Sequence, residues 1–284
     1  MRPDELQTRE RIILKKNHRL LILYHSGAGS TKTVAEIYYK MLSSYIVDIS
    51  PIELTYEYKK LQDYDFIVFA FPTYHCSPSS SIMEYINDMP AFDKHKNAFA
   101  FTTCGLYSGN ALRVFIKKCL SKNIIINGYS IYKAPATDGA LILSTLPFMF
   151  RYENKIAHKI KSDIKRIENI INTDASVVQC PPFKLYEILN YPNKIIGKAY
   201  KHKLRILKEY CVKCRRCADN CIRKCWNTDG EYPEYAGLKC EFCFKCVHHC
   251  PNGAIVLSAK TKSRIKFNEQ FYKSLKEKIL YKIF

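Results

Sequence analysis

The chain has 284 residues, a length that fits two compact domains or one large one. Its apolar fraction of 47% and charged fraction of 25% are ordinary for globular proteins and exclude wholesale disorder and a collagen-like fibre. No apolar run approaches the roughly 20 residues that a membrane-spanning helix needs. The charged first 18 residues do not resemble a signal peptide, so we expect a soluble, cytoplasmic protein.

The net charge is +19, and the excess of lysine and arginine concentrates in residues 151–210 and 261–284. Such a charge can attract an anionic partner, although a merely solvated surface is the simpler explanation of the charge itself. No nucleic-acid-binding motif accompanies the charge. We therefore expect an acidic protein as the partner, and neither nucleic acid nor a membrane surface.

Residues 19–172 alternate between short apolar runs and amphipathic segments. The apolar runs predict buried strands at residues 20–24, 45–49, 66–71, 98–101 and within 124–132. Apolar residues at helical spacing predict helices within residues 34–42, 82–89, 112–119 and 156–171. Ser30 or Thr31 is placed to cap the first helix. This alternation predicts a parallel α/β sheet, which binds ligands beyond the carboxyl ends of its strands.

Three loops follow those carboxyl ends. The first is Ser26-Gly27-Ala28-Gly29-Ser30-Thr31. It suits a phosphate, because its glycines allow a tight turn and its N–H groups meet at a helix N-terminus, but alone it is equally compatible with a plain strand-to-helix turn. The other two loops offer backbone polar groups and aromatic faces for a planar ring. Their candidate contacts are Pro72, Thr73, Tyr74, Thr103, Cys104, Gly105, Tyr107, Gly109 and Asn110.

Ser26, Gly29 and Thr31 match the phosphate loop of the flavodoxin family, and Ala28 and Ser30 depart from it. The loops Pro72-Thr73-Tyr74 and Thr103-Cys104-Gly105 look like the flavin-ring loops of that family. The resemblance covers roughly residues 19–172. It implies a doubly wound, five-stranded parallel sheet in the order 2-1-3-4-5 and bound FMN.

Four other side chains near these loops are weaker candidates. Cys76 and Cys104 are candidates for a covalent role and His25 and His75 for a proton-donating one, but we favour ordinary loop positions for all four. Cys119 lies on the apolar face of a predicted helix, so we expect it in the core.

Nine of the 13 cysteines fall between Cys211 and Cys250. The spacing Cys-x2-Cys-x2-Cys-x3-Cys occurs twice there, 29 residues apart. Zinc sites use pairs of Cys-x2-Cys, whereas three close cysteines with a displaced fourth suit a [4Fe–4S] cluster that borrows its fourth ligand from the other run. We therefore predict one cluster on Cys211, Cys214, Cys217 and Cys250, and a second on Cys240, Cys243, Cys246 and Cys221.

Residues 207–258 resemble the bacterial two-cluster ferredoxins, with Cys250-Pro251 following the family pattern closely. Ile222 and Cys225 depart from that pattern, and Cys225 competes with Cys221 as a ligand. We favour Cys221 because it keeps the repeat regular. His248 and His249 lie between two ligands, and we expect them to face solvent rather than bind metal.

These patterns divide the chain into five parts. A charged extension (1–18) precedes the flavodoxin-like domain (19–172), a basic connector (173–206) leads to a small α+β ferredoxin-like domain (207–258), and a basic amphipathic tail (259–284) follows. We expect a helix in the basic stretch from 194 to 208. We also expect a tail helix that packs back on the body, with a membrane-surface helix as the alternative.

A flavodoxin-like module followed by a two-cluster module resembles the flavodoxin–ferredoxin fusions of anaerobes. The resemblance implies an electron carrier that relays low-potential electrons between FMN, two [4Fe–4S] clusters and a redox partner protein. Two alternatives stay open. The chain could be an FMN-dependent reductase of a small acceptor such as a quinone, or a flavin-free ferredoxin or redox sensor on a vestigial flavodoxin scaffold.

Overall fold

The computed structural model describes residues 18–54, 57–142, 147–173, 177–185, 204–258 and 266–284. Within these ranges no helix is both long and apolar enough to span a membrane. The N-terminal extension before His18 and most of the basic connector lie outside the described residues.

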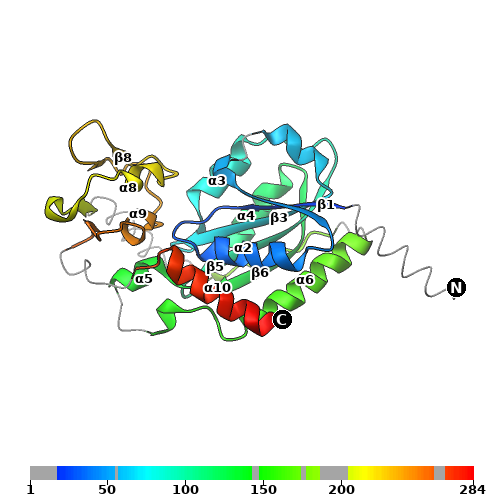
Figure 1. Cartoon of the computed structure of the whole chain (residues 1–284). Helices are drawn as coiled ribbons and strands as arrows, with labels where there is room; N and C mark the ends of the chain where they lie inside the picture. The colour runs from blue at the N-terminus through cyan, green and yellow to red at the C-terminus, as the bar shows by residue number, and fades with distance from the viewer. Residues whose placement is uncertain (1–17, 55–56, 143–146, 174–176, 186–203, 259–265) are drawn as a thin grey trace.

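The N-terminal module is built on a parallel sheet with helices on both faces (Figure 1). The strands are β1 (Arg19–Tyr24), β2 (Ile46–Pro51), β3 (Phe66–Tyr74), β5 (Lys96–Cys104) and β6 (Ile124–Lys133). Their spatial order is β2-β1-β3-β5-β6, and all neighbours on this path are parallel. This is the predicted order 2-1-3-4-5, which is that of flavodoxin-like sheets. A two-residue strand, β4 (Ser77–Pro78), pairs with the end of β3 and was not predicted.

Alternate residues of the strands face opposite helical layers. Leu20 and Ile22 of β1 pack in one core with α2 (Ser30–Met41) and α6 (Ile156–Thr173). Leu21 and Leu23 pack in the other core with α3 (Ser80–Asp88) and α4 (Ala111–Leu120). Burial on both faces explains why the strands read as continuous apolar runs. The four predicted helices are confirmed, and Cys119 is buried in α4 as expected.

The C-terminal helix α10 (Glu269–Ile283) lies alongside α2 and α6 (Figure 1). Its Ile279 and Ile283 belong to the same core as those two helices. Asn268 caps the helix by accepting a hydrogen bond from Phe271 N at 3.0 Å. The prediction that the tail packs back on the body is therefore confirmed for these residues.

The C-terminal module repeats itself in structure as it does in sequence. Its first half contains β7 (Arg205–Ile206), α8 (Arg216–Asp219) and β8 (Trp226–Asn227). The second half contains the equivalent β9 (Glu234–Tyr235), α9 (Lys245–His248) and β10 (Ile255–Val256). β7 pairs with β10 and β8 pairs with β9, both antiparallel, so each pair takes one strand from each half. This exchange of strands parallels the predicted exchange of the fourth cysteine.

The backbone of the two cysteine runs also repeats. Lys213 and Arg215 have φ values of 56° each, and the equivalent Phe242 and Phe244 have φ values of 60° and 53°. Left-handed conformations are uncommon for non-glycine residues. Their recurrence at equivalent positions shows that both runs fold into the same loop.

Residues 177–185 of the connector lie on the N-terminal module. Gln179 N donates to Ile126 O of β6 at 2.8 Å. The helix expected over 194–208 falls mainly outside the described residues. Where it can be compared, residues 205–206 form strand β7 instead, because they pair with β10.

Candidate functional site

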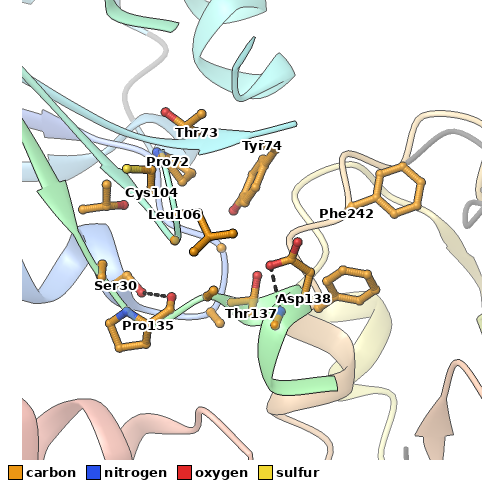
Figure 2. A pocket seen from close by; sticks show the side chains of 18 of the residues that line it. Ser30, Pro72, Thr73, Tyr74, Cys104, Leu106, Pro135, Thr137, Asp138 and Phe242 are labelled. Carbon is orange, nitrogen blue, oxygen red and sulfur yellow. Dashed lines mark hydrogen bonds between the residues drawn. The ribbon is translucent and has the colours of Figure 1, made fainter. Parts of the chain in front are cut away.

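The loops after β1, β3 and β5 meet in one pocket at the carboxyl edge of the sheet, with an empty volume of about 1150 Å³ including its open mouth. Figure 2 shows Pro72 and Cys104 on one side of this pocket and Phe242 of the C-terminal module on the other. The predicted residues that line it are Ser26, Gly27, Ala28, Ser30, Thr31, Pro72, Thr73, Tyr74, Thr103, Cys104, Gly105 and Tyr107. Gly29, Gly109 and Asn110 do not line it.

The first loop presents backbone N–H groups rather than hydroxyls. Within the described residues, no acceptor pairs with the N–H groups of Ala28, Gly29, Ser30 or Thr31. These groups lie at the N-terminus of the 12-residue helix α2, where the helix dipole favours an anion. The loop therefore fits a phosphate.

The hydroxyls of this loop are already bonded within the protein. Ser30 Oγ donates to Pro135 O at 3.2 Å, and Thr31 Oγ1 pairs with Thr103 Oγ1 at 2.8 Å. Neither residue caps α2, so that prediction is wrong. Its first turn is instead capped from Ser26, whose Oγ accepts from Lys32 N at 3.2 Å.

Gly29 faces α10 rather than the pocket. Its φ is +144°, and a Cβ there would lie 2.4 Å from Cδ2 of Tyr272. The Tyr272 hydroxyl also lies 2.9 Å from Ser30 Oγ. Helix α10 thus packs against the phosphate loop through Tyr272, a contact that the sequence did not indicate.

Asn110 has a structural role. Its side chain accepts from Lys184 N at 2.9 Å and donates to Lys184 O at 3.4 Å. It therefore holds the connector on α4 instead of reaching the pocket.

A fourth loop completes the pocket, and the sequence analysis missed it. It follows β6, contains Pro135 and leads into the short helix α5 (Thr137–Ile142), whose Thr137 and Asp138 also line the pocket (Figure 2). The carboxyl end of the predicted fifth strand was a signal for this loop that was not used. His75 and Cys76, two of the weaker candidates, also line the pocket, whereas Leu106, Met149, Phe242 and Phe244 are lining residues that were not predicted.

The structure gives no catalytic role to three of the weaker candidates, Cys104, His75 and His25. Cys104 is buried, and burial raises the pKa of its thiol to about 12, so it is not a nucleophile at neutral pH. His75 lines the pocket and packs edge-on against Phe242, with ring centroids 5.5 Å apart. His25 does not line the pocket at all.

His25 instead joins the two modules. Its Nε2 lies 2.7 Å from Oε1 of Glu241, a residue between two of the predicted cluster ligands, and its Nδ1 lies 3.2 Å from Glu53. The other Glu241 oxygen accepts from Ser81 N and Ser81 Oγ at 3.1 and 2.9 Å. Burial alone would lower the pKa of His25, but the charge and hydrogen bonds of Glu241 outweigh it and raise the pKa to about 9.

We expect His25→Ala to reduce the free energy of unfolding by about 3–5 kcal/mol near pH 6, because it leaves the Glu241 carboxylate buried and unpaired. The raised pKa of His25 means that its stabilisation is complete below about pH 6.5 and is lost as the pH rises through about 9. Urea unfolding at both ends of that range should show wild type and variant converging at high pH. The exposed His95→Ala is the control, and equal stability of wild type and H25A near pH 6 would refute the prediction.

The eight repeated cysteines line two cavities. The first has an empty volume of about 360 Å³ and is lined by Cys211, Cys214, Cys217 and Cys250. The second, of about 400 Å³, is lined by Cys221, Cys240, Cys243 and Cys246 together with Cys225. The four-cysteine sets are those of the two predicted clusters. Among the described residues, however, no three His, Cys, Asp or Glu side chains are arranged to hold a metal ion.

The donors of the second cavity fit an iron–sulfur cluster. The Trp226 indole N–H and the Tyr235 hydroxyl are buried at this cavity and have no oxygen or nitrogen partner among the described residues. Sulfur atoms of a cluster accept such hydrogen bonds. Burial also raises the pKa of the Cys246 thiol, so the positive charge of iron would be needed to hold it as a thiolate.

Cys225 and the two histidines of the second run are placed by specific contacts. The Cys225 N–H donates to Cys221 Sγ at 3.4 Å and its thiol donates to Arg223 O at 3.5 Å, and hydrogen bonding to Cys225 lowers the pKa of the Cys221 thiol. His248 is buried, contrary to the expectation that it faces solvent, because its Nε2 bonds Thr137 O at 2.9 Å and its ring stacks on Phe267. His249 bonds Ala28 O at 2.8 Å.

No protein-family model and no curated protein matches the chain. Among solved structures, a flavodoxin from the Archaea is 15% identical, over 54% of this chain and 99% of that one, with a TM-score of 0.41. A WrbA-like flavodoxin from Agrobacterium tumefaciens is 16% identical, over 56% and 100% of the two chains, with a TM-score of 0.42. Megasphaera elsdenii flavodoxin is 20% identical, over 39% and 84%, with a TM-score of 0.36.

The N-terminal module has a flavodoxin-like fold. This assignment rests on its strand order, since similarities this low carry nothing about the site.

The flavodoxin-like pocket and the second cysteine cavity share a wall. Phe242 and Phe244 line both of them, and Cys243 lies between these two residues in the chain. On the same side, a Cβ on Gly27 would lie 2.6 Å from Cys243 Cβ. The phosphate loop and the second cysteine loop are therefore in direct contact.

Proposed function

We propose that this protein is an electron-transfer flavo-iron–sulfur protein that carries FMN and two [4Fe–4S] clusters. The observation that carries the proposal is the shared wall of Phe242 and Phe244 between the pocket and the second cysteine cavity. Bound FMN exchanges one or two electrons and each cluster exchanges one, so contact between their sites would join a two-electron donor to a one-electron acceptor.

The pocket residues would bind and orient the flavin. The N–H groups of Ala28, Ser30 and Thr31, which have no acceptor within the described residues, would hold its phosphate. Loops 72–74 and 103–107 would contact the ring, and Phe242 would close the pocket from the other module. Buried Phe242 and Phe244 would keep water from the wall between the sites.

The cysteines of the C-terminal module would ligate the clusters in the two sets that line the cavities. Support comes from the match between those sets and the ligand exchange expected from the repeat. Zinc is the other metal that clustered cysteines bind. A zinc site would need four thiols around a single ion.

The proposal is tested by the cofactor content of anaerobically purified protein. We expect about eight irons and eight sulfides per chain and one FMN, by chemical analysis and by absorbance. Iron and sulfide without flavin, and no FMN uptake at micromolar concentration, would favour a flavin-free ferredoxin on a vestigial scaffold. Turnover of a quinone without any second protein would favour a reductase.

We expect Ser30→Ala to weaken FMN binding about tenfold, because it removes the bond from Ser30 Oγ to Pro135 O that ties the phosphate loop to the fourth loop. Titration of flavin fluorescence measures the affinity. Ser121→Ala, at the end of α4, removes a comparable hydroxyl-to-carbonyl bond away from the pocket and should leave the affinity unchanged. An unchanged FMN affinity in Ser30→Ala would contradict the prediction, because it would show that the bond from Ser30 to Pro135 does not support FMN binding.

A further inference from the structure

The two cysteine cavities differ in their distance from the flavodoxin-like pocket. The second shares Phe242 and Phe244 with the pocket, and its Cys243 touches the phosphate loop at Gly27. The first cavity is lined only by residues between Ile206 and Ile255 and shares none of them with the pocket. The second cavity lies beside the first, because cysteines of both pack against the same core (Cys217 and Cys250 of the first, and Cys221, Cys240 and Cys246 of the second). A chain of sites thus runs from the pocket through the second cavity to the first.

The first cavity reaches the protein surface. Cys214, one of its four cysteines, is exposed, whereas the cysteines of the second cavity are at most partly exposed. Beside it, Val212 is 60% exposed and Tyr210 is 40% exposed. A cluster held there would have its edge next to solvent.

The same surface is positively charged. Arg215 and Arg216 are exposed, line the first cavity, and have no ion-pair or hydrogen-bond partner for their guanidinium groups within the described residues. Exposed guanidinium groups next to an exposed apolar side chain are typical of a surface that another protein covers. Their charge selects an acidic partner.

We propose that this surface, formed by Tyr210, Val212, Arg215 and Arg216 around Cys214, is the docking site of an acidic one-electron carrier protein. This inference rests on the proposed function. One electron would pass between the cluster on Cys211, Cys214, Cys217 and Cys250 and the redox centre of the docked carrier, so that one is oxidised as the other is reduced, with no proton or atom transferred. The cluster beside the pocket would pass electrons between the flavin and the first cluster, and only the first cluster would exchange them with the carrier.

The test measures binding of an oxidised, acidic [2Fe–2S] ferredoxin to the iron-loaded full chain by calorimetry, at low and at high salt. We expect salt to weaken the complex, and the double variant Arg215→Glu/Arg216→Glu to weaken it about tenfold or more at low salt. Arg215 is already a non-glycine residue with positive φ, so Glu adopts the same backbone at a comparable cost.

The control is Lys94→Glu/Lys117→Glu, which makes the same change of net charge at two exposed lysines of the flavodoxin-like module. It should bind the ferredoxin nearly as tightly as wild type. The milder Arg215→Gln/Arg216→Gln should fall between wild type and the charge reversal. Iron content and circular dichroism confirm that each variant is folded and loaded.

Equal affinities of the reversed and control variants would overturn the docking site. So would a reversed variant that loses affinity for anionic vesicles or duplex DNA but not for the ferredoxin. Failure of the proposed function has a different signature, since wild-type protein would then lack iron and sulfide whatever its affinity for the ferredoxin.

Discussion

Cys243→Ala should lose one cluster and keep the other, reducing the iron content from about eight to about four per chain. Cys243 lines the second cavity with Cys240, Cys246 and Cys221, and it does not line the first. Alanine keeps the Cβ that packs against Gly27, so the contact between modules should survive. Iron and sulfide analysis and low-temperature electron paramagnetic resonance of the reduced protein would measure the loss.

Two variants sharpen this experiment. Cys119→Ala removes a buried thiol from α4, far from both cavities in the fold, and should leave the iron content unchanged. Cys225→Ala decides between the competing fourth ligands, because we expect it to keep both clusters, whereas Cys221→Ala should lose one. An iron content that stays near eight per chain in Cys243→Ala would show that our ligand sets are wrong.

Gly29→Val should abolish FMN binding. Valine is strained at a φ of +144°, and its Cβ would lie 2.4 Å from the ring of Tyr272. Relief of either conflict moves the phosphate loop, because Gly29 immediately precedes α2 and the N–H groups of its first turn. Flavin fluorescence titration should show no binding at micromolar FMN, while iron content stays at the wild-type value.

The matched control is Gly230→Val, at a position where an added Cβ has no neighbour closer than 3.7 Å. It should bind FMN like wild type. A second variant separates the two causes, since Tyr272→Ala removes the ring but leaves the φ unchanged. Partial recovery of FMN binding in Gly29→Val/Tyr272→Ala is expected if the clash contributes, and tight FMN binding by Gly29→Val alone would contradict the prediction.

The sheet and its helices could be predicted because each is a local pattern. Both faces of the sheet are covered, so strands such as β3 read as unbroken apolar runs, and α4 shows its buried face at regular spacing. The cysteine sets were predictable for the same reason, since the repeat is visible in the spacing alone. Neither required knowledge of contacts distant in the chain.

Several of the missed features depend on contacts between segments far apart in sequence. Nothing near Ser30 indicates that its hydroxyl binds Pro135, 105 residues away, rather than capping α2. His248 is buried only because Thr137 and Phe267 meet it from two other segments. Phe242 and Phe244 stand between the cysteines of the second run, and only the packing of the two modules shows that they line the pocket.

The path of the chain gives the cysteine-rich unit two attachments to the sheet domain. The backbone is on the flavodoxin-like module up to residue 185, forms the cysteine loops between 204 and 258, and returns as α10 to fill the core beside α2 and α6. A domain joined by one linker can swing, whereas a domain anchored at both ends explores far fewer orientations. Removal of α10 would therefore leave the cysteine-rich module attached to the flavodoxin-like module through the connector alone. It would also remove Tyr272, which packs against Gly29 of the phosphate loop.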